Sequence, residues 1–281
     1  MHDRTPDMSV DHQRLVDDDF GKLTSRWKDL YFERSLFGII HQQRHALALS
    51  WIDELGLPVG SRVLEVGCGA GLLAVELTRR GFAVDCMDSS EPMVDLARQL
   101  AESAGVSNRL TPSVGDAHSL DYPDGAYRLV VALGVLPFLH TPGLALREVA
   151  RVLAPGGYAL LTSDNRYRLD HVFDPRYTPP LLPFKRLAKA IVRALVRNPH
   201  LARTPWHLFS FRQVDRLLAD AGMVPMRRQT LGFGPFSLLG RPLLAEEKAI
   251  RLHRRLQKLA DRGATVLRRT GGQQILLAQR H

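Results

Sequence analysis

The sequence has little cysteine and no long apolar run. Its only cysteines among 281 residues are Cys68 and Cys86. They fall in an expected loop and an expected strand, so we expect neither a disulfide framework nor a metal site. A transmembrane helix needs about eighteen consecutive apolar residues, and no such run is present. Residues 1–20 are acidic and polar, unlike a signal peptide, which predicts a cytoplasmic protein.

Charge is divided unevenly along the chain. Residues 1–163 contain 15 Lys and Arg against 21 Asp and Glu, whereas residues 164–281 contain 23 against 8. With 45% hydrophobic residues, the chain can bury the core of one large domain with insertions. We therefore expect a cofactor-binding part, followed by a basic part that meets an anionic partner or surface.

From residue 62 onward, short β-rich runs alternate with segments of helical periodicity. This alternation predicts an α/β fold with a doubly wound, mostly parallel, seven-stranded sheet of the Rossmann-like type. The expected strands are 62–66, 83–88, 109–114, 127–133, 158–163, 225–231 and 274–280. The expected helices are 71–80, 91–103, 142–153, 211–221 and 246–262, with one or two more within 20–57.

Three regions interrupt the alternation and suggest a domain organisation. Residues 1–57 are expected to form a tail and a helical lid, and residues 58–163 the α/β core. Residues 164–206 are expected to form a basic helical insertion that caps the acceptor. Residues 207–281 then complete the sheet, with a second helical insertion at 233–270.

A glycine-rich loop follows the first expected strand. Gly67, Gly69 and Gly71 stand at every second position, and a helical segment comes next. Because glycine has no Cβ, backbone N–H groups of such a loop can approach a ligand closely. Dinucleotide dehydrogenases carry a related loop, but Leu72 occupies their third glycine position, so the spacing favours S-adenosylmethionine (SAM) over NAD.

Two acids follow the next two expected strands. Asp88 closes the second strand, where a carboxylate can accept hydrogen bonds from ribose hydroxyls. Asp116, within Gly115-Asp116-Ala117, follows the third strand, where it can accept from an exocyclic adenine amine. Each acid alone is also typical of a turn or a helix cap. Together with the glycine loop, they mark three successive strand ends, which favours a nucleotide site.

These residues resemble the class I SAM-dependent methyltransferases of the small-molecule, methyltransferase-11-like type. The resemblance covers residues 62–163, with a weaker echo in the last two strands. Its motifs are Glu65-x-Gly67-x-Gly69-x-Gly71, Asp88-x-Ser90-x-x-Met93, Gly115-Asp116-Ala117 and Leu144-x-x-x-Arg147-Glu148-x-x-Arg151-Val-Leu-x-Pro155-Gly156-Gly157. Arg128 departs from the pattern, since many relatives have an acid there, and we interpret it as a surface change.

The resemblance implies SAM as cofactor and a role for each matching residue. Glu65 orders the glycine loop and the methionine ammonium, and Asp88 takes the ribose. Asp116 and Ala117 bind the adenine edge. The remaining implied contacts are Gly67, Cys68, Gly69 and Gly71 in the loop, Ser89 beside Asp88, Met93 against the adenine, and Leu133 and Gly134 beside the methionine. Met93 and Cys68 also fit purely structural interpretations, as a helix core residue and a small loop residue.

The sequence indicates the cofactor better than the acceptor. The segment after the fourth strand lacks the polar-Pro-Pro-aromatic motif of base-amine methyltransferases, and both cysteines lie at the cofactor end. Nucleic-acid methylation is therefore disfavoured. Methyl transfer needs a base only if the acceptor must lose a proton. His140 is the candidate base because it follows the fourth strand, although a loop or capping role fits it better; further histidines considered are His41, His45, His118 and His207.

The insertion at 164–206 contains a basic amphipathic segment. Its apolar residues are Phe184, Leu187, Ile191 and Leu195, and its cations Lys185, Lys189, Arg193 and Arg197 repeat every four residues. The pattern predicts either a surface for anionic lipid or a lipid-delivered substrate, or an ordinary helix with its charges in water. A second basic helix at 246–262 could complete a roof over the acceptor.

We therefore expect an enzyme that methylates a small or lipid-linked metabolite, at oxygen, by in-line transfer from SAM. It would be cytoplasmic, with peripheral contact to an anionic membrane through its basic part. Two alternatives remain open. The basic second half suits an RNA methyltransferase, and a non-catalytic scaffold could retain the fold and dock on acidic membranes or partners.

Overall fold

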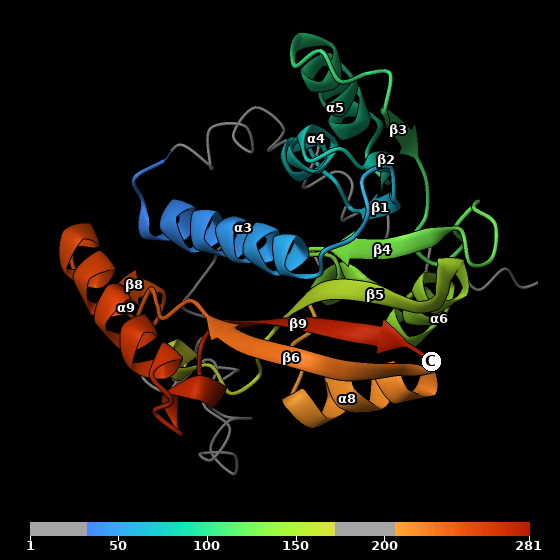
Figure 1. The fold of residues 1–281 in the computed structure, drawn as a ribbon. Helices are drawn as coiled ribbons and strands as arrows, with labels where there is room; N and C mark the ends of the chain where they lie inside the picture. The colour runs from blue at the N-terminus through green and yellow to red at the C-terminus, as the bar shows by residue number, and fades with distance from the viewer. Residues whose placement is uncertain (1–32, 172–205) are drawn as a thin grey trace, which may run out of the picture.

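A seven-stranded sheet forms the centre of the computed structural model, which describes residues 33–171 and 206–281 (Figure 1). The strands lie in the order β3-β2-β1-β4-β5-β9-β6. The first five strands of this order pair in parallel, and β9 is antiparallel to both β5 and β6. Their bounds are β1 Arg62–Val66, β2 Ala83–Asp88, β3 Leu110–Val114, β4 Tyr127–Ala132, β5 Leu153–Asp164, β6 Met223–Leu231 and β9 Gln273–Arg280. The expected mostly parallel, doubly wound sheet is confirmed.

Helices cover both faces of this sheet. One cluster of buried residues joins the sheet to α3, α4 and α5, and a second joins it to α6 and α8. The helices are α3 Leu36–Glu54, α4 Leu72–Arg79, α5 Glu91–Ser103, α6 Pro142–Val152, α8 Phe211–Asp220 and α9 Glu246–Asp261. Figure 1 shows α9 beyond the start of β9, beside the first part of α3. It packs on α3 through Leu36, Ile40 and Ala249.

Alternation along each strand decides which side chains face which helices. On β1, Val63 packs in the α3–α4–α5 cluster, whereas Leu64 packs in the α6–α8 cluster. On β5, Leu160 and Leu161 divide in the same way. Because side chains alternate with a period of two, Glu65 also belongs to the α3 face.

The junction between α6 and β5 differs from the sequence prediction. The helix was expected to reach Leu153 and the strand to begin at Tyr158. Instead α6 ends at Val152, and Leu153 already has extended backbone angles of φ −71° and ψ 137°. The strand therefore starts five residues early, and its register against β4 shifts between Tyr127 and Leu129. This irregularity accommodates Pro155, which cannot donate a ladder hydrogen bond.

The other helix and strand boundaries differ from the expected ones by at most two residues. The segment 233–270 contains a two-stranded sheet of β7 Ser237–Leu238 and β8 Arg241–Pro242, besides the expected α9 and a short 3₁₀ helix, η4 Leu267–Arg269. Most of the predicted insertion, 172–205, and the start of the predicted lid, 1–32, lie outside the described residues. Within the described ranges, none of the helices combines the length and apolarity needed to cross a bilayer.

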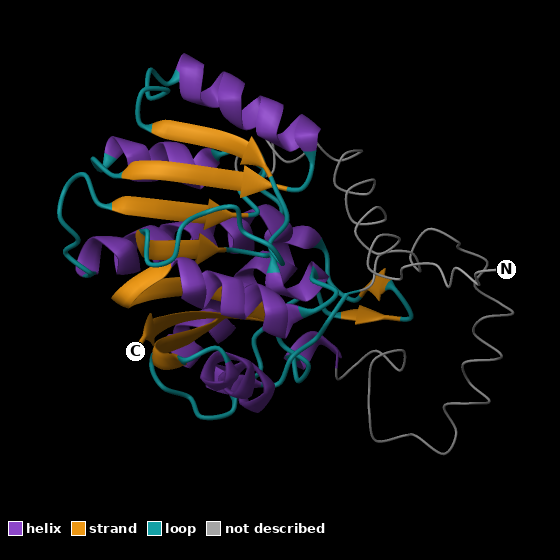
Figure 2. Cartoon of the chain, turned by 90° about the vertical axis from the view of Figure 1, so that its right-hand side faces the viewer, coloured by secondary structure: helices purple, strands orange, loops and turns teal. Residues whose placement is uncertain are grey.

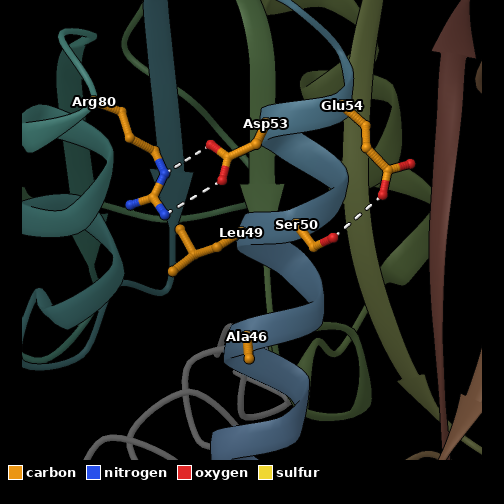
Figure 3. Close-up of a pocket in the computed structure, with 6 residues that line it drawn as sticks. All are labelled: Ala46, Leu49, Ser50, Asp53, Glu54 and Arg80. Carbon is orange, nitrogen blue, oxygen red and sulfur yellow. Dashed lines mark hydrogen bonds and ion pairs between the residues drawn. The ribbon is translucent and has the colours of Figure 1, made fainter.

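A surface hollow of about 630 Å³ lies between α3 and the end of α4 (Figure 3). Arg80 and Asp53 form a two-pronged ion pair beside it, at 2.8 and 3.4 Å. Ser50 donates to Glu54 at 3.2 Å. These residues precede β1 and β2, so the hollow is at the amino ends of the strands. Ligands of open α/β sheets bind at the carboxyl ends, so we place the functional site at the opposite edge.

Candidate functional site

The glycine loop after β1 requires glycine for two different reasons. Gly67, Gly69 and Gly71 all have positive φ, at 69°, 51° and 79°. A Cβ on Gly67 would overlap Cγ2 of Val135, and one on Gly71 would lie 2.9 Å from Cβ of Ala97. A Cβ on Gly69 would meet no atom within 4 Å. The loop is therefore packed at both ends and open in its middle, where a ligand can approach the backbone.

Asp88 ties this loop to the end of β2. Its Oδ2 accepts the backbone N–H of Gly69 at 2.9 Å, and its Oδ1 accepts that of Ser90 at 3.0 Å. The carbonyl of Met87 accepts the N–H groups of Gly67 and Cys68, at 2.7 and 3.0 Å. These bonds fix the loop and the carboxylate as one unit. Ser89 lies between these groups and is half-buried.

Glu65 is a buried acid on the α3 face of the sheet. Its side chain is enclosed, and Oε2 has no hydrogen-bond partner among the described residues. Burial raises the pKa of Glu65 to about 8, against an ordinary value of 4.5, although a backbone hydrogen bond from Ala74 opposes the shift. An unpartnered buried acceptor is costly for a protein to keep. It suits a ligand that brings a cation.

Arg44 of α3 is a second buried charge at this edge. Its Nε has no partner among the described residues, and its Nη1 lies 3.1 Å from the position of a Cβ on Gly134. Gly134 in turn donates its N–H to Oγ1 of Thr162 at 2.6 Å. Sequence analysis missed Arg44. Its signal is a charged residue in the buried stripe of α3, beside Ile40 and Ala48.

Asp164 ends β5 on the same face of the sheet, in step with Leu160 and Thr162. It is buried, and burial raises the pKa of its carboxyl, while the charges of Arg168 and Arg44 oppose that shift. Trp206 donates a hydrogen bond to it. Sequence analysis missed this residue too, because an acid at a strand end resembles any turn residue.

Asp116 lies exposed after β3 and is held by a histidine pair. Its Oδ1 accepts both the backbone N–H and Nδ1–H of His118, at 2.9 and 2.7 Å. These bonds lower the pKa of Asp116, although burial acts against them. The ring of His118 stacks on that of His140 at 3.6 Å. His118 Nε2 accepts the N–H of Thr141 at 3.3 Å, so both ring nitrogens have partners that fix the ring beside Asp116.

The remaining residues expected to contact the cofactor are buried or half-buried. Met93 is buried on α5, an environment that fits core packing as well as a ligand contact. The thiol of Cys68 is buried beside Cys86, and this contact together with burial raises the pKa of Cys68. Ala117, Leu133 and Gly134 are half-buried at the strand ends. Burial and the charge of Arg44 lower the pKa of His41 to about 3, which leaves its ring neutral.

The site thus gathers residues from four neighbouring strand ends. The glycine loop, the turn after β2, the turn after β3 and the loop after β4 adjoin one another through the bonds above. Within residues 33–171 and 206–281, His, Cys, Asp and Glu side chains form no group that could hold a metal ion. The chemistry of the site is that of hydrogen bonding and of two buried side chains, Glu65 and Arg44, which each keep one polar atom without a hydrogen-bond partner among the described residues.

Comparisons with known proteins agree with this geometry. A family model described as a methyltransferase domain matches residues 63–157. The chain is 30% identical over 180 residues to the ubiquinone biosynthesis O-methyltransferase of Acinetobacter baylyi, which is 63% of this chain and 73% of that protein. It is 32% identical to the protein of the same name from Aeromonas salmonicida, over 52% of this chain and 60% of that protein. The match thus spans less than two thirds of the latter.

Solved structures show the same fold. Magnesium protoporphyrin IX methyltransferase from Synechocystis, with bound S-adenosylhomocysteine (SAH), superposes with a TM-score of 0.64 and 20% identity. That superposition covers 96% of this chain and all of the other. Geranyl diphosphate C-methyltransferase from Streptomyces coelicolor superposes with a TM-score of 0.54 and 20% identity, over 85% and 80% of the two chains.

Proposed function

We propose that this chain, which belongs to the class I SAM-dependent methyltransferases, is an O-methyltransferase. It transfers the methyl group of SAM to an oxygen atom of a small or lipid-linked metabolite. The observation that carries the proposal is a pair of buried side chains at the carboxyl edge, Glu65 on β1 and Arg44 on α3. Each has one polar atom, Oε2 and Nε, without a hydrogen-bond partner among the described residues. The amino-acid end of SAM carries one ammonium and one carboxylate. It therefore complements an acid and a guanidinium.

Each end of the cofactor has residues in this chain that fit it. Glu65 would hold the ammonium, and Arg44 the carboxylate, through a charge-assisted bond to its fixed fork. Asp88 would accept ribose hydroxyls, since the N–H groups of Gly69 and Ser90 fix its carboxylate at the end of β2. The adenine would contact Asp116 and its neighbours, with Ala117 and Met93 lining the ring and Ser89, Leu133 and Gly134 completing the enclosure.

Catalysis would consist mainly of alignment. When bound, SAM supplies an activated methyl group with a good leaving group. The side chains of this protein have to position the acceptor in line with that methyl and exclude water. Proximity and orientation of this kind contribute about 7–11 kcal/mol. The rigid connections from the glycine loop to Asp88, and from Gly134 to Thr162, would provide that alignment.

A hydroxyl acceptor has to lose its proton, and two residues are candidates for the base. Asp164 lies on the same sheet face as Glu65, and its raised pKa makes its carboxylate a better proton acceptor than an ordinary aspartate. His140 remains the candidate from the sequence. Its Nδ1 lies 2.8 Å from Oγ1 of Thr141, and its ring stacks on that of His118. Both contacts suit a structural role for His140 better than a catalytic one.

The acceptor class rests on the relatives and on the basic half of the chain. The names of the matched relatives specify O-methylation in a biosynthetic pathway. The basic insertion proposed to cap the acceptor lies mostly outside the described residues, so contact of Lys185, Lys189 and Arg193 with an anionic membrane stays a proposal from the sequence. The division into domains after residues 57, 163 and 206 likewise stays a proposal from the sequence.

The test is transfer of label from methyl-labelled SAM into a metabolite extract, followed by identification of the labelled product. We expect a product labelled at an oxygen atom of a small or lipid-linked molecule. Label in RNA would favour the RNA methyltransferase alternative. In that case the binding of RNA to the protein should weaken steeply as the salt concentration rises. Binding of SAH without transfer to any extract would favour a non-catalytic scaffold. Failure of the folded protein to bind SAM or SAH would refute the proposal.

A further inference from the structure

The β7–β8 hairpin exposes three leucines. Leu238, Leu239 and Leu243 are 44%, 56% and 49% exposed. Leu238 pairs with Arg241, so the loop between the two strands contains only Leu239 and Gly240. The N–H of Leu243 closes the hairpin on the carbonyl of Phe236 at 2.9 Å. A short, hydrogen-bonded hairpin therefore projects apolar side chains from its tip.

Leu239 occupies a backbone conformation that leucine disfavours. Its φ is +50°, and the next residue, Gly240, has φ +84°. Two-residue hairpin loops with positive φ at both positions are normally built from Asn-Gly or Gly-Gly. Among the described residues, Leu239 is the only one other than glycine with positive φ. Because Leu239 is more than half exposed, its packing offsets little of this strain, which points to a function for its side chain.

Cations lie immediately beyond the hairpin. Residues 243–245 connect it to α9, whose buried face consists of Ala249, His253, Gln257 and Ala260. The opposite face presents exposed cations at helical spacing: Lys248, Arg251, Arg254, Arg255, Lys258 and Arg262 at the C-cap. Within the described residues, only one of these six forms an ion pair, Arg251 with Glu247 at 3.8 Å. This face concentrates positive charge on the helix that follows the apolar hairpin along the chain.

The hairpin and α9 connect directly to the candidate site. Figure 2 shows the small two-stranded sheet beyond the arrowheads of the parallel strands, on the side where their carboxyl ends lie. At its base, Leu244 and Ile250 pack on the cluster of Leu36, Ile40 and Ala249. Leu36 and Ile40 belong to α3, the helix that also carries Arg44. A surface that contacts the hairpin would thus lie near the edge where an acceptor enters.

We infer that the β7–β8 hairpin and α9 form a docking surface for anionic lipid bilayers. Leu238, Leu239 and Leu243 insert among the acyl chains just below the headgroups, and Arg241 and the α9 cations bind the phosphates. An apolar insertion flanked by cations is the combination that holds a protein at a membrane interface. The cations favour an anionic occupant, and the exposed leucines favour one with an apolar interior directly below its charged surface, which is what an anionic bilayer offers. The surface deepens the proposed function, since it would deliver a lipid-linked acceptor.

The test is sedimentation of the full chain with phosphatidylcholine vesicles, with and without phosphatidylglycerol. We expect binding to the anionic vesicles only. Leu239→Asn should weaken that binding about tenfold, the effect of withdrawing one leucine from an apolar environment. Asparagine tolerates positive φ, so the same variant should unfold at an equal or higher temperature. Lys248→Glu with Arg255→Glu should weaken binding at least about tenfold, because each interfacial cation contributes about fivefold.

Matched controls change the same chemistry elsewhere. Met226→Ser removes a 59%-exposed apolar side chain from β6. Arg109→Glu with Arg128→Glu reverses two exposed cations at the amino ends of β3 and β4. Neither control should affect vesicle binding. The assay needs no turnover, so it is independent of methyl transfer.

Three outcomes would overturn the inference. The first is equal sedimentation of wild type, Leu239→Asn and the α9 double variant. The second is a fall in unfolding temperature for Leu239→Asn, which would mean that another segment of this chain covers the leucine. The third is salt-sensitive RNA binding through the α9 cations without any vesicle binding.

Discussion

Gly69 donates its backbone N–H to Oδ2 of Asp88 across 2.9 Å, and this bond joins the open part of the glycine loop to the end of β2. The carboxylate therefore serves two partners. Its Oδ2 holds the loop, and its Oδ1 accepts the N–H of Ser90, beside the place proposed for the ribose. Loss of the side chain should affect ligand binding more than folding.

Asp88→Ala should weaken SAH binding by roughly tenfold to a hundredfold, equivalent to about 1.5–3 kcal/mol for a hydrogen bond to a charged group. Isothermal titration calorimetry measures this. Asp95→Ala is the matched control, because it removes an exposed acid of α5 whose ion partner is Arg98. An unchanged dissociation constant in Asp88→Ala would show that the ribose lies elsewhere.

Arg44→Gln should discriminate between two ligands. SAH contains the amino-acid group that Arg44 is proposed to bind, whereas 5′-methylthioadenosine lacks it. We expect SAH binding to weaken at least about tenfold, from loss of one charge-assisted bond. Binding of 5′-methylthioadenosine should stay unchanged, and the same titrations on Asp88→Ala should weaken both ligands. Equal losses for the two ligands in Arg44→Gln would contradict the assignment.

The raised pKa of Glu65 predicts how stability depends on pH. Its pKa is about 8 in the folded protein and 4.5 ordinarily. Between these values the native state binds a proton that the unfolded state has released, so this group lowers stability as pH rises from about 5 to 8. Glu65→Gln should flatten that decline in unfolding temperature, and the exposed control Glu91→Gln should not. Parallel profiles for all three proteins would argue against a buried, protonated Glu65.

Gly67→Ala tests the contact between the glycine loop and the loop after β4. The new Cβ would overlap Val135, in addition to the strain of a positive φ. Gly56→Ala carries the same kind of strain at φ 58° with no atom within 4 Å. Overpacking should make Gly67→Ala less stable than Gly56→Ala by about 1–3 kcal/mol in urea unfolding. Val135→Ala in the Gly67→Ala background should restore part of the difference; no restoration would mean that the clash is relieved in another way.

Asp164→Asn should lower kcat at least about a hundredfold once an acceptor is identified, because an amide cannot take its proton. The dissociation constant for SAH should be unaffected. His140→Gln is the comparison that decides between the two candidate bases. If His140→Gln loses activity and Asp164→Asn retains it, the base is the histidine.

The sequence predicted the strands and the glycine loop well because their signals are local. Val63 and Leu64 alternate within one run, and Gly67, Gly69 and Gly71 show their spacing in five residues. Arg44 and Asp164 were missed for the opposite reason. Their significance depends on burial beside strand ends far away in the sequence, and neither residue type shows burial by itself. The start of β5 was misplaced for a third reason, since a proline followed by two glycines is atypical of a strand, whereas here Pro155 belongs to an irregularity within β5.

The position of β9 has a consequence for biosynthesis. It is the last of the seven strands to be synthesised, yet it pairs with β5 on one side and β6 on the other. A ribosome-bound chain that lacks residues 273–280 therefore has two unpaired strand edges that no earlier segment in the sheet covers. Premature termination within these eight residues would divide the sheet rather than trim its border.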